Sequence, residues 1–154
     1  MKIQELRSWD EWRESFAVMQ ELRPHLNELQ YLDLLESMGK EGYRLFALRD
    51  AGRIVSLAGV GILTNLSYGR HVWVYDLVTR GDACSRGYGR RLLEFVEEFS
   101  RREGCGTVAL LSNLQRTDAH RFYERRMGYE KPSYVFRKRL AEAPRRTENA
   151  GDAS

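Results

Sequence analysis

The stretch that decides the fold is C-S-R-G-Y-G-R-R-L-L, residues Cys84 to Leu93. It follows the strand-like run His71 to Thr79 and begins an amphipathic helical pattern. Gly87 and Gly89 have no Cβ atoms, so backbone N–H groups can close around an anion there. A helix N-terminus adds unpaired amides and the positive end of the helix dipole. The stretch therefore predicts a turn that binds the pyrophosphate of a nucleotide cofactor, which favours an enzyme.

Basic side chains surround this turn. Arg86, Arg90 and Arg91 would suit a cofactor with several phosphates. Solvated charge at a helix end explains any one of them equally well, and only the cluster is suggestive. The predicted cofactor-binding turn comprises Cys84, Ser85, Arg86, Gly87, Tyr88, Gly89, Arg90 and Arg91.

Length and composition narrow the class of protein. The chain has 154 residues, 42% of them hydrophobic, which suffices for one substantial core but not for two ordinary domains. Lys and Arg exceed Asp and Glu by only 25 to 22, which argues against nucleic acid as a partner. The two cysteines, Cys84 and Cys105, form no short-spaced cluster with histidine, so no disulfide framework or metal site is expected. An apolar signal segment and long apolar runs are both lacking, so we expect a cytoplasmic protein with no membrane partner.

Hydrophobic periodicity predicts the elements before the turn. Trp9, Trp12, Phe16 and Met19 share one helical stripe that ends before Pro24. A second helix is expected from near Asn27 to Gly39 or Gly42. Three antiparallel strands follow, Tyr43 to Leu48, Ile54 to Leu63 and His71 to Thr79, the first two joined by a hairpin turn at residues 50–53.

The pattern after the turn predicts the rest of the order. Leu92, Val96 and Phe99 form the apolar stripe of a central helix. A short strand from Thr107 to Leu111, a helix from Asp118 to Arg126 and a closing strand from Tyr134 to Leu140 are expected next. The predicted order is ααβββαβαβ in a single domain of residues 1–140. Residues 141–154 show no periodicity and predict a disordered tail.

Two motifs in this order resemble the GNAT superfamily of N-acetyltransferases over roughly Tyr43 to Leu140. The family's turn, Q/R-x-x-G-x-G/A, corresponds to residues 84–89, with Cys84 in place of the leading Gln or Arg. A second block, A-H-R-F-Y-E at residues 119–124 followed by Met127-Gly128-Tyr129, is similar to the family's A-x-x-F-Y-E-x-x-G-F/Y. The resemblance implies an α/β (α+β) fold, a mixed, mostly antiparallel twisted sheet flanked by helices. It also implies acetyl-CoA as co-substrate.

The resemblance implies roles for particular residues. Leu77, Val78 and Thr79 would offer main-chain groups to the pantetheine arm and the thioester oxygen. Tyr123 matches the family tyrosine near the cofactor sulfur, and its phenol would protonate the departing thiolate. A half-buried helix aromatic is the alternative explanation of Tyr123.

The base and the acceptor site are less determined. Some family members carry a carboxylate where this register has Trp73, so Asp76 is the first candidate for the base, directly or through water. An Asp that pairs with an arginine is an equally good interpretation. Tyr31 and Trp73 are predicted to form an apolar wall for the acceptor.

The leading hypothesis is an acetyl-CoA-dependent N-acetyltransferase that acetylates a primary amine of a small molecule or peptide directly. The missing carboxylate at Trp73 supports an alternative, a non-catalytic acyl-CoA-binding regulatory module. A nucleic-acid-binding domain has only its arginine content in its favour. Family members often dimerise, so the resemblance also allows a homodimer.

Overall fold

The computed structural model describes residues 1–112 and 116–141. The chain separates into two parts, residues 1–117 and residues 118–154, and each is described by itself. Apart from Ala141, the predicted tail at 141–154 lies outside the described residues. No helix in the described ranges has both the length and the apolar composition that crossing a membrane requires.

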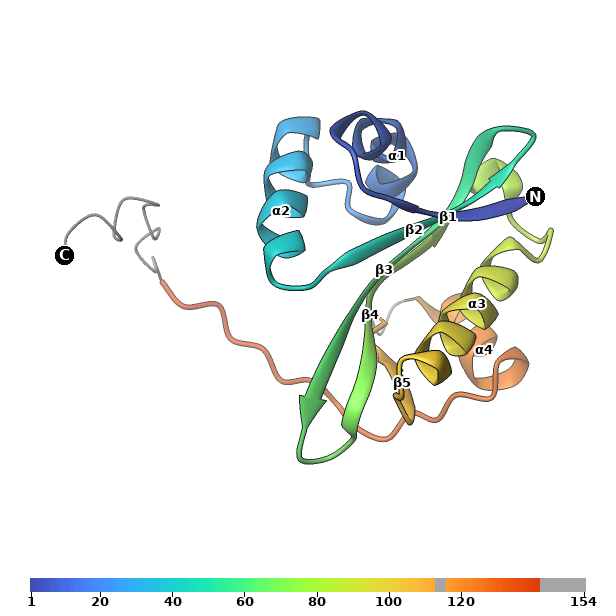
Figure 1. Cartoon of the computed structure of the whole chain (residues 1–154). Coiled ribbons are helices and arrows are strands. Elements are labelled where there is room, and N and C mark those ends of the chain that lie inside the picture. Colours follow the sequence, from blue (N-terminus) through green and yellow to red (C-terminus); the bar gives the residue numbers. More distant parts are fainter. Residues whose placement is uncertain (113–115, 142–154) are drawn as a thin grey trace. The chain divides into compact units, whose positions relative to one another are not determined.

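The first part is built on a five-stranded sheet with strand order β1-β2-β3-β4-β5 (Figure 1). Neighbouring strands are antiparallel from β1 to β4, and β5 runs parallel to β4. The predicted class, a mixed and mostly antiparallel sheet flanked by helices, is confirmed. The strands are β1 (Lys2–Leu6), β2 (Arg44–Asp50), β3 (Arg53–Asn65), β4 (Gly69–Thr79) and β5 (Thr107–Leu110).

Two helices with side-chain caps precede β2. In α1 (Trp9–Leu22), Ser8 Oγ accepts a hydrogen bond from Glu11 N at 3.2 Å, and the Glu11 carboxylate accepts one from Ser8 N. In α2 (Glu28–Lys40), Asn27 Oδ1 accepts from Gln30 N at 2.8 Å. Both are capping boxes, which satisfy amides that the first helical turn leaves unpaired.

Helices α1 and α2 lie on one face of the sheet, and α3 (Tyr88–Arg102) lies on the other (Figure 1). On the face of α1 and α2, Val18 and Leu35 pack in one buried cluster with Leu45 and Leu57 of the sheet. On the other face, α3 brings Phe95 to within 5.1 Å of Phe46, centroid to centroid. Leu45 and Phe46 are consecutive residues of β2, so the alternation of a strand separates the two cores.

The predicted order of elements is wrong at both ends. The structure begins with β1, which the sequence pattern did not indicate, because only Ile3 and Leu6 of its five residues are apolar. Residues 134–140 form no strand, although a closing strand was predicted there, and Tyr134 and Phe136 are exposed. A strand needs a hydrogen-bonded neighbour as well as a pattern, and no ladder with this segment exists in the described residues.

The second part is helical. The helix α4 (Thr117–Arg121) starts at the last residue of the first part and continues as the π-helical turn η2 (Phe122–Arg126). In that turn Met127 N donates to Phe122 O at 3.1 Å. A helix over residues 118–126 is thus confirmed, with a wider final turn of a kind that is frequent at functional sites.

Candidate functional site

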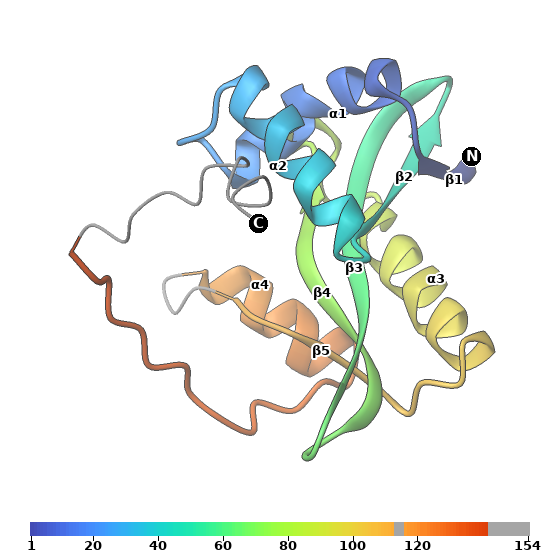
Figure 2. The same cartoon turned by 60° about the vertical axis from the view of Figure 1, so that its left-hand side comes forward.

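Strand β4 has an unpaired edge. Its pairing with β5 runs only from His71 opposite Thr107 to Val74 opposite Leu110. Strand β5 ends at Leu110, and the two strands separate toward the end of β5 (Figure 2). Among the described residues, the segment 75–79 therefore pairs with β3 on one side only and presents an open edge on the other.

The main-chain groups along this edge alternate in direction. Arg80 N donates to Val55 O at 2.9 Å, so the groups of Arg80 face β3. Two residues earlier, Val78 O accepts a hydrogen bond from Ser56 Oγ at 2.9 Å, also on the β3 side. By alternation, the N–H and C=O groups of Leu77 and Thr79 point to the open edge. Of the three residues predicted to bind the pantetheine arm, these two have suitably directed main chains, whereas Val78 does not.

A β-bulge lies where the pairing with β5 ends. Gly59 is opposite Asp76 and Val60 is opposite Val74, so Tyr75 is an extra residue in β4. A bulge bends its strand and increases the local twist. This explains why β4 leaves β5 after Val74.

The open edge leads into the glycine turn. After the 3₁₀ turn η1 (Gly81–Ala83), Ser85 and Gly87 adopt left-handed conformations with φ of 69° and 78°. Gly87 is the N-cap of α3 and suits this conformation because it lacks a Cβ atom. Within the described ranges, the amides of residues 86–90 have no hydrogen-bond acceptor in the protein. These donors and the positive end of the helix dipole make the turn a suitable place for a diphosphate.

The side chains of the turn have different roles. The buried Tyr88 donates its hydroxyl hydrogen bond to the Asp50 carboxylate, so its ring belongs to the core. Cys84 is an exposed free thiol that donates to Arg80 O at 3.2 Å. Arg90 forms an ion pair with Glu94 at 2.9 Å. The remaining arginines of the turn, Arg86 and Arg91, are exposed, and so is Ser85.

Asp76 lies in a polar network. Its Oδ1 is 2.9 Å from Nη2 of Arg23, which follows α1, and its Oδ2 accepts the hydroxyl hydrogen bond of Tyr43 at 2.7 Å. Only 12% of the Asp76 side chain is exposed. Arg23 Nη2 also donates to the carbonyl of Tyr75 at 3.0 Å, which satisfies a carbonyl of the bulge. Burial and the Asp76 carboxylate both raise the pKa of Tyr43 well above 10, so this phenol stays protonated and donates.

These contacts favour the second interpretation of Asp76, a carboxylate paired with an arginine. Both of its oxygens are already engaged, so Asp76 is better placed to hold Arg23 and Tyr43 than to take a proton. Arg23 could not be identified as the partner from the sequence pattern, because it is 53 residues away from Asp76. Tyr43 and Tyr75 were also missed as members of the site.

The two residues of the predicted acceptor wall lie in different environments. Tyr31 is 3% exposed, and its hydroxyl lies 2.7 Å from Ser15 Oγ inside the core. Burial raises its pKa to about 12. Tyr31 is therefore a core residue and not an accessible wall, because its position on α2 faces the sheet. Trp73 is half-buried on β4, opposite Gly61.

Tyr123 belongs to the second part of the chain. It lies in the π-helical turn η2, where its carbonyl accepts from Tyr129 N at 2.8 Å. Its ring centroid is 5.4 Å from that of Phe122 and 6.1 Å from that of Tyr129. These contacts fix the backbone and ring of Tyr123 within its own part.

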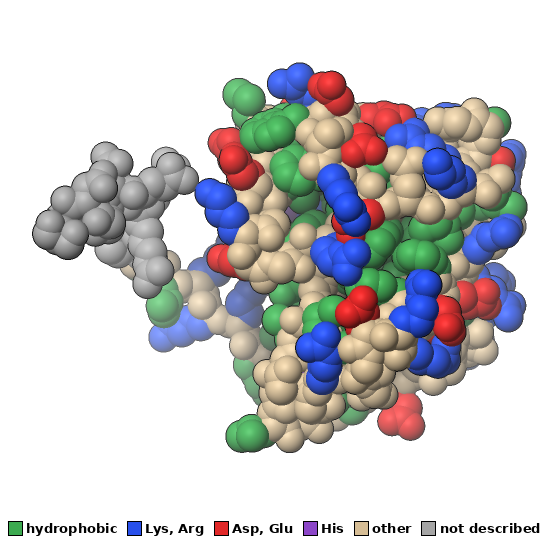
Figure 3. Space-filling view, in the orientation of Figure 1, with side chains coloured by type: hydrophobic (Ala, Val, Ile, Leu, Met, Phe, Trp, Pro, Cys, Tyr) green, Lys and Arg blue, Asp and Glu red, His purple; other side chains and the backbone are tan. Residues whose placement is uncertain are grey.

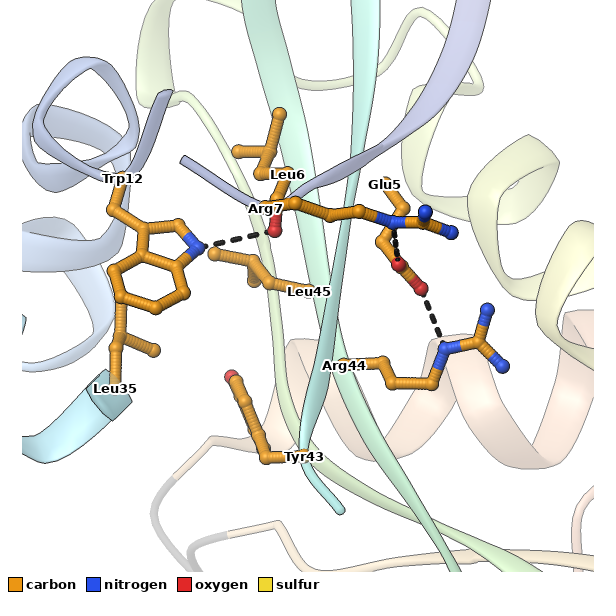
Figure 4. Close-up of a pocket in the computed structure, with 8 residues that line it drawn as sticks. All are labelled: Glu5, Leu6, Arg7, Trp12, Leu35, Tyr43, Arg44 and Leu45. Carbon is orange, nitrogen blue, oxygen red and sulfur yellow. Dashed lines mark hydrogen bonds and ion pairs between the residues drawn. The ribbon is translucent and has the colours of Figure 1, made fainter. Parts of the chain in front are cut away.

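A separate pocket of about 160 Å³ lies between the first two strands and the first two helices (Figure 4). Trp12 Nε1 donates to Leu6 O at 3.0 Å on one side of it, and Glu5 pairs with Arg7 and Arg44 on the other. The single carboxylate of this lining is thus shared by two guanidinium groups. Acidic and basic side chains are also interspersed over the face seen in Figure 3, in keeping with the small net charge.

The chain belongs to the acetyltransferase (GNAT) family, whose model matches residues 4–129. It is an N-acetyltransferase, and acetyl-CoA is the acetyl donor that this family uses. The chain is 44% identical to the uncharacterized N-acetyltransferase YhdJ of Bacillus subtilis over 137 residues, which cover 88% of this chain and 96% of that protein.

Other similarities agree with this family. The aminoalkylphosphonate N-acetyltransferase of Salmonella typhimurium is 33% identical over 99 residues, covering 64% of this chain and 62% of that protein. The solved structure of the aminoglycoside N-acetyltransferase AAC(6')-Iy in complex with CoA superposes with a TM-score of 0.78 at 15% identity. That alignment covers 90% of this chain and 93% of the solved chain, and it supports the fold.

Proposed function

We propose that this enzyme transfers the acetyl group of acetyl-CoA directly to a primary amine of a small molecule or a peptide. One observation carries the proposal. The open edge of β4 at residues 75–79 leads directly into the turn whose amides, at residues 86–90, have no acceptor in the described part of the protein. The 33% identical aminoalkylphosphonate N-acetyltransferase supports a small amine as acceptor.

In this proposal the donor extends along β4. The turn holds the diphosphate, with Arg86, Arg90 and Arg91 adding positive charge. Leu77 and Thr79 then bind the pantetheine arm as a neighbouring strand would. At about 3.3 Å per residue, Thr79 to Tyr75 spans about 13 Å, which carries the acyl end toward the bulge.

The chemistry requires one bond to form and one to break. The amine nitrogen attacks the thioester carbonyl, and the carbon–sulfur bond breaks with its electron pair on sulfur. Tyr123 gives its phenolic proton to that sulfur, and the proton lost by the amine restores the phenol through water. Asp76 serves as a positioning residue in this scheme, because Arg23 and Tyr43 occupy its oxygens.

Direct transfer is favoured over an acetyl-enzyme. The exposed thiol of Cys84 donates to a main-chain carbonyl, which is no base that could activate it as a nucleophile. We also infer that both parts of the chain form a single acetyltransferase domain, an inference supported by the family match across residues 4–129.

The decisive experiment is a screen of amines with acetyl-CoA and detection of free thiol. The panel contains polyamines, aminoglycosides, amino acids, peptide N-termini, aminoalkylphosphonates and arylalkylamines. Acetyl-CoA should raise the melting temperature, whereas DNA and RNA should not. Stabilisation by acetyl-CoA without thiol release for any amine would contradict the proposal and favour a non-catalytic acyl-CoA-binding module.

A further inference from the structure

Two glycines of β3 make room for two tyrosines on the face of α1 and α2. A Cβ atom at Gly59 would lie 1.6 Å from Tyr43 Oη, and one at Gly61 would lie 3.0 Å from Tyr75 Cε2. The tyrosine rings therefore lie directly over the backbone of β3. Their centroids are 5.6 Å apart with the planes tilted by 54°.

This aromatic surface continues along β4. Trp73 is opposite Gly61, and cross-strand partners share a face, so Trp73 lies on the same side of the sheet as Tyr75. Tyr75 is 36% exposed and Trp73 is half-buried. We define the aromatic surface as Tyr43, Trp73 and Tyr75 above Gly59 and Gly61.

The charges that touch this surface are matched. Asp76 and Arg23 form an ion pair, and Arg23 also binds the carbonyl of Tyr75. A bound group therefore meets aromatic faces beside a neutralised pair. Such a surface suits an apolar or aromatic body better than a highly charged one.

The aromatic surface also lies where the acyl group would emerge. Tyr75 is both its most exposed tyrosine and the first residue of the open edge of β4. An amine held over Tyr75 would be next to the end of the pantetheine arm at Leu77.

We propose that the aromatic surface is the acceptor site and that the preferred acceptor is a primary amine on a short linker attached to an aromatic or compact apolar group. Tyr75 is its specificity-determining residue and stacks on that group. Arg23 is a positioning residue that holds the bulge through the carbonyl of Tyr75. This inference rests on the proposed function and adds the class of acceptor to it.

Steady-state kinetics with the full chain tests the proposal, with phenethylamine, spermidine and 2-aminoethylphosphonate as probes. Wild type should show the highest kcat/KM for phenethylamine. Tyr75→Ala should raise the KM for phenethylamine about five- to tenfold, as expected for the loss of a stacked ring, and should leave the KM for acetyl-CoA within about twofold. Tyr75→Phe should retain the wild-type KM, because the ring and not the hydroxyl makes the contact.

Two further variants separate a local effect from misfolding. Gly61→Ala places a methyl group against the Tyr75 ring and should raise the KM for phenethylamine with residue 75 intact. Tyr68→Ala is the matched control, because it removes a tyrosine ring that packs on His71 at the β3–β4 turn. It should change neither KM.

The possible failures can be told apart. If no amine in the screen releases thiol, the proposed function itself fails. Two results would refute the aromatic acceptor site and leave the proposed function intact. One is a higher kcat/KM for spermidine or 2-aminoethylphosphonate than for phenethylamine. The other is a Tyr75→Ala variant in which the KM for every amine is unchanged.

Discussion

Replacing Gly59 with alanine tests the architecture beneath the site. The added methyl carbon would lie 1.6 Å from Tyr43 Oη and 2.3 Å from Cζ, far inside van der Waals contact. The ring of Tyr43 must then leave its place over β3. Its hydrogen bond to Asp76, 2.7 Å long, is lost with it.

The expected cost follows from these two effects. Overpacking of this kind costs about 1–3 kcal/mol, and the loss of a hydrogen bond to a charged group costs about 1.5–3 kcal/mol. Together they predict a loss of about 2.5–6 kcal/mol, a large fraction of the roughly 5–15 kcal/mol that stabilises a typical domain. The free energy of unfolding in urea measures it.

Gly39→Ala in α2 is the matched control, because nothing lies within 4 Å of a Cβ atom there. It should stabilise the protein by about 0.5–1 kcal/mol through helix propensity. Tyr43→Phe removes the same hydrogen bond, so its effect and that of Gly59→Ala should be less than additive. A Gly59→Ala variant within about 1 kcal/mol of wild type would refute the placement of Tyr43 over β3.

Three further predictions concern catalysis, the turn and pH. Tyr123→Phe should lower kcat by at least about a hundredfold and leave the KM for acetyl-CoA unchanged, and an unaltered kcat would remove Tyr123 from the mechanism. Gly87→Ala should destabilise the turn, since φ of Gly87 is 78°, and should weaken acetyl-CoA binding several-fold in calorimetry. Gly104→Ala is the control, because Gly104 has a φ of 75° at the other end of α3. It should destabilise the protein to a similar extent without affecting the binding of acetyl-CoA. The amides of Arg7 and Ser8 lower the pKa of Glu11 from its ordinary 4.5. The ionised Glu11 side chain therefore stabilises the folded state fully above pH 4.5, and this stabilisation is lost as the pH falls through the lowered pKa of Glu11. The urea midpoints of wild type and Glu11→Gln should therefore converge in acid.

Local features of the fold could be predicted from the sequence. Ser8 and Asn27 begin helices because their side chains satisfy amides only three residues away. The hairpin at residues 50–53 likewise depends on its own turn residues, with positive φ at Ala51 and Gly52. The motif around Gly87 combines a turn and a helix start, and both are local.

Features that depend on distant partners could not be predicted. The strand β1 exists because β2 pairs with it, across more than 35 residues of sequence. The sequence allowed Asp76 to be either a base or the partner of an arginine, but it did not identify Arg23 and Tyr43, which bind its two oxygens. Tyr31 was predicted to form a wall for the acceptor, but its burial and its hydrogen bond to Ser15 show that it faces the core.

The bulge at Tyr75 connects these non-local features. Before the bulge, Val72 and Val74 pair with Ile62 and Val60 on the face of α3. After the bulge, Asp76 and Val78 pair with Gly59 and Leu57 on the face of α1 and α2. One extra residue exchanges the faces of every side chain that follows. If Tyr75 paired in register with Gly59, Asp76 would lie opposite Ala58, and its carboxylate would point to the apolar core under α3. No pattern of period two along β4 reveals this exchange, and the space that Tyr75 occupies is left by Gly61 on the neighbouring strand. The same extra residue ends the pairing with β5, so the donor edge and the aromatic surface have a common structural origin.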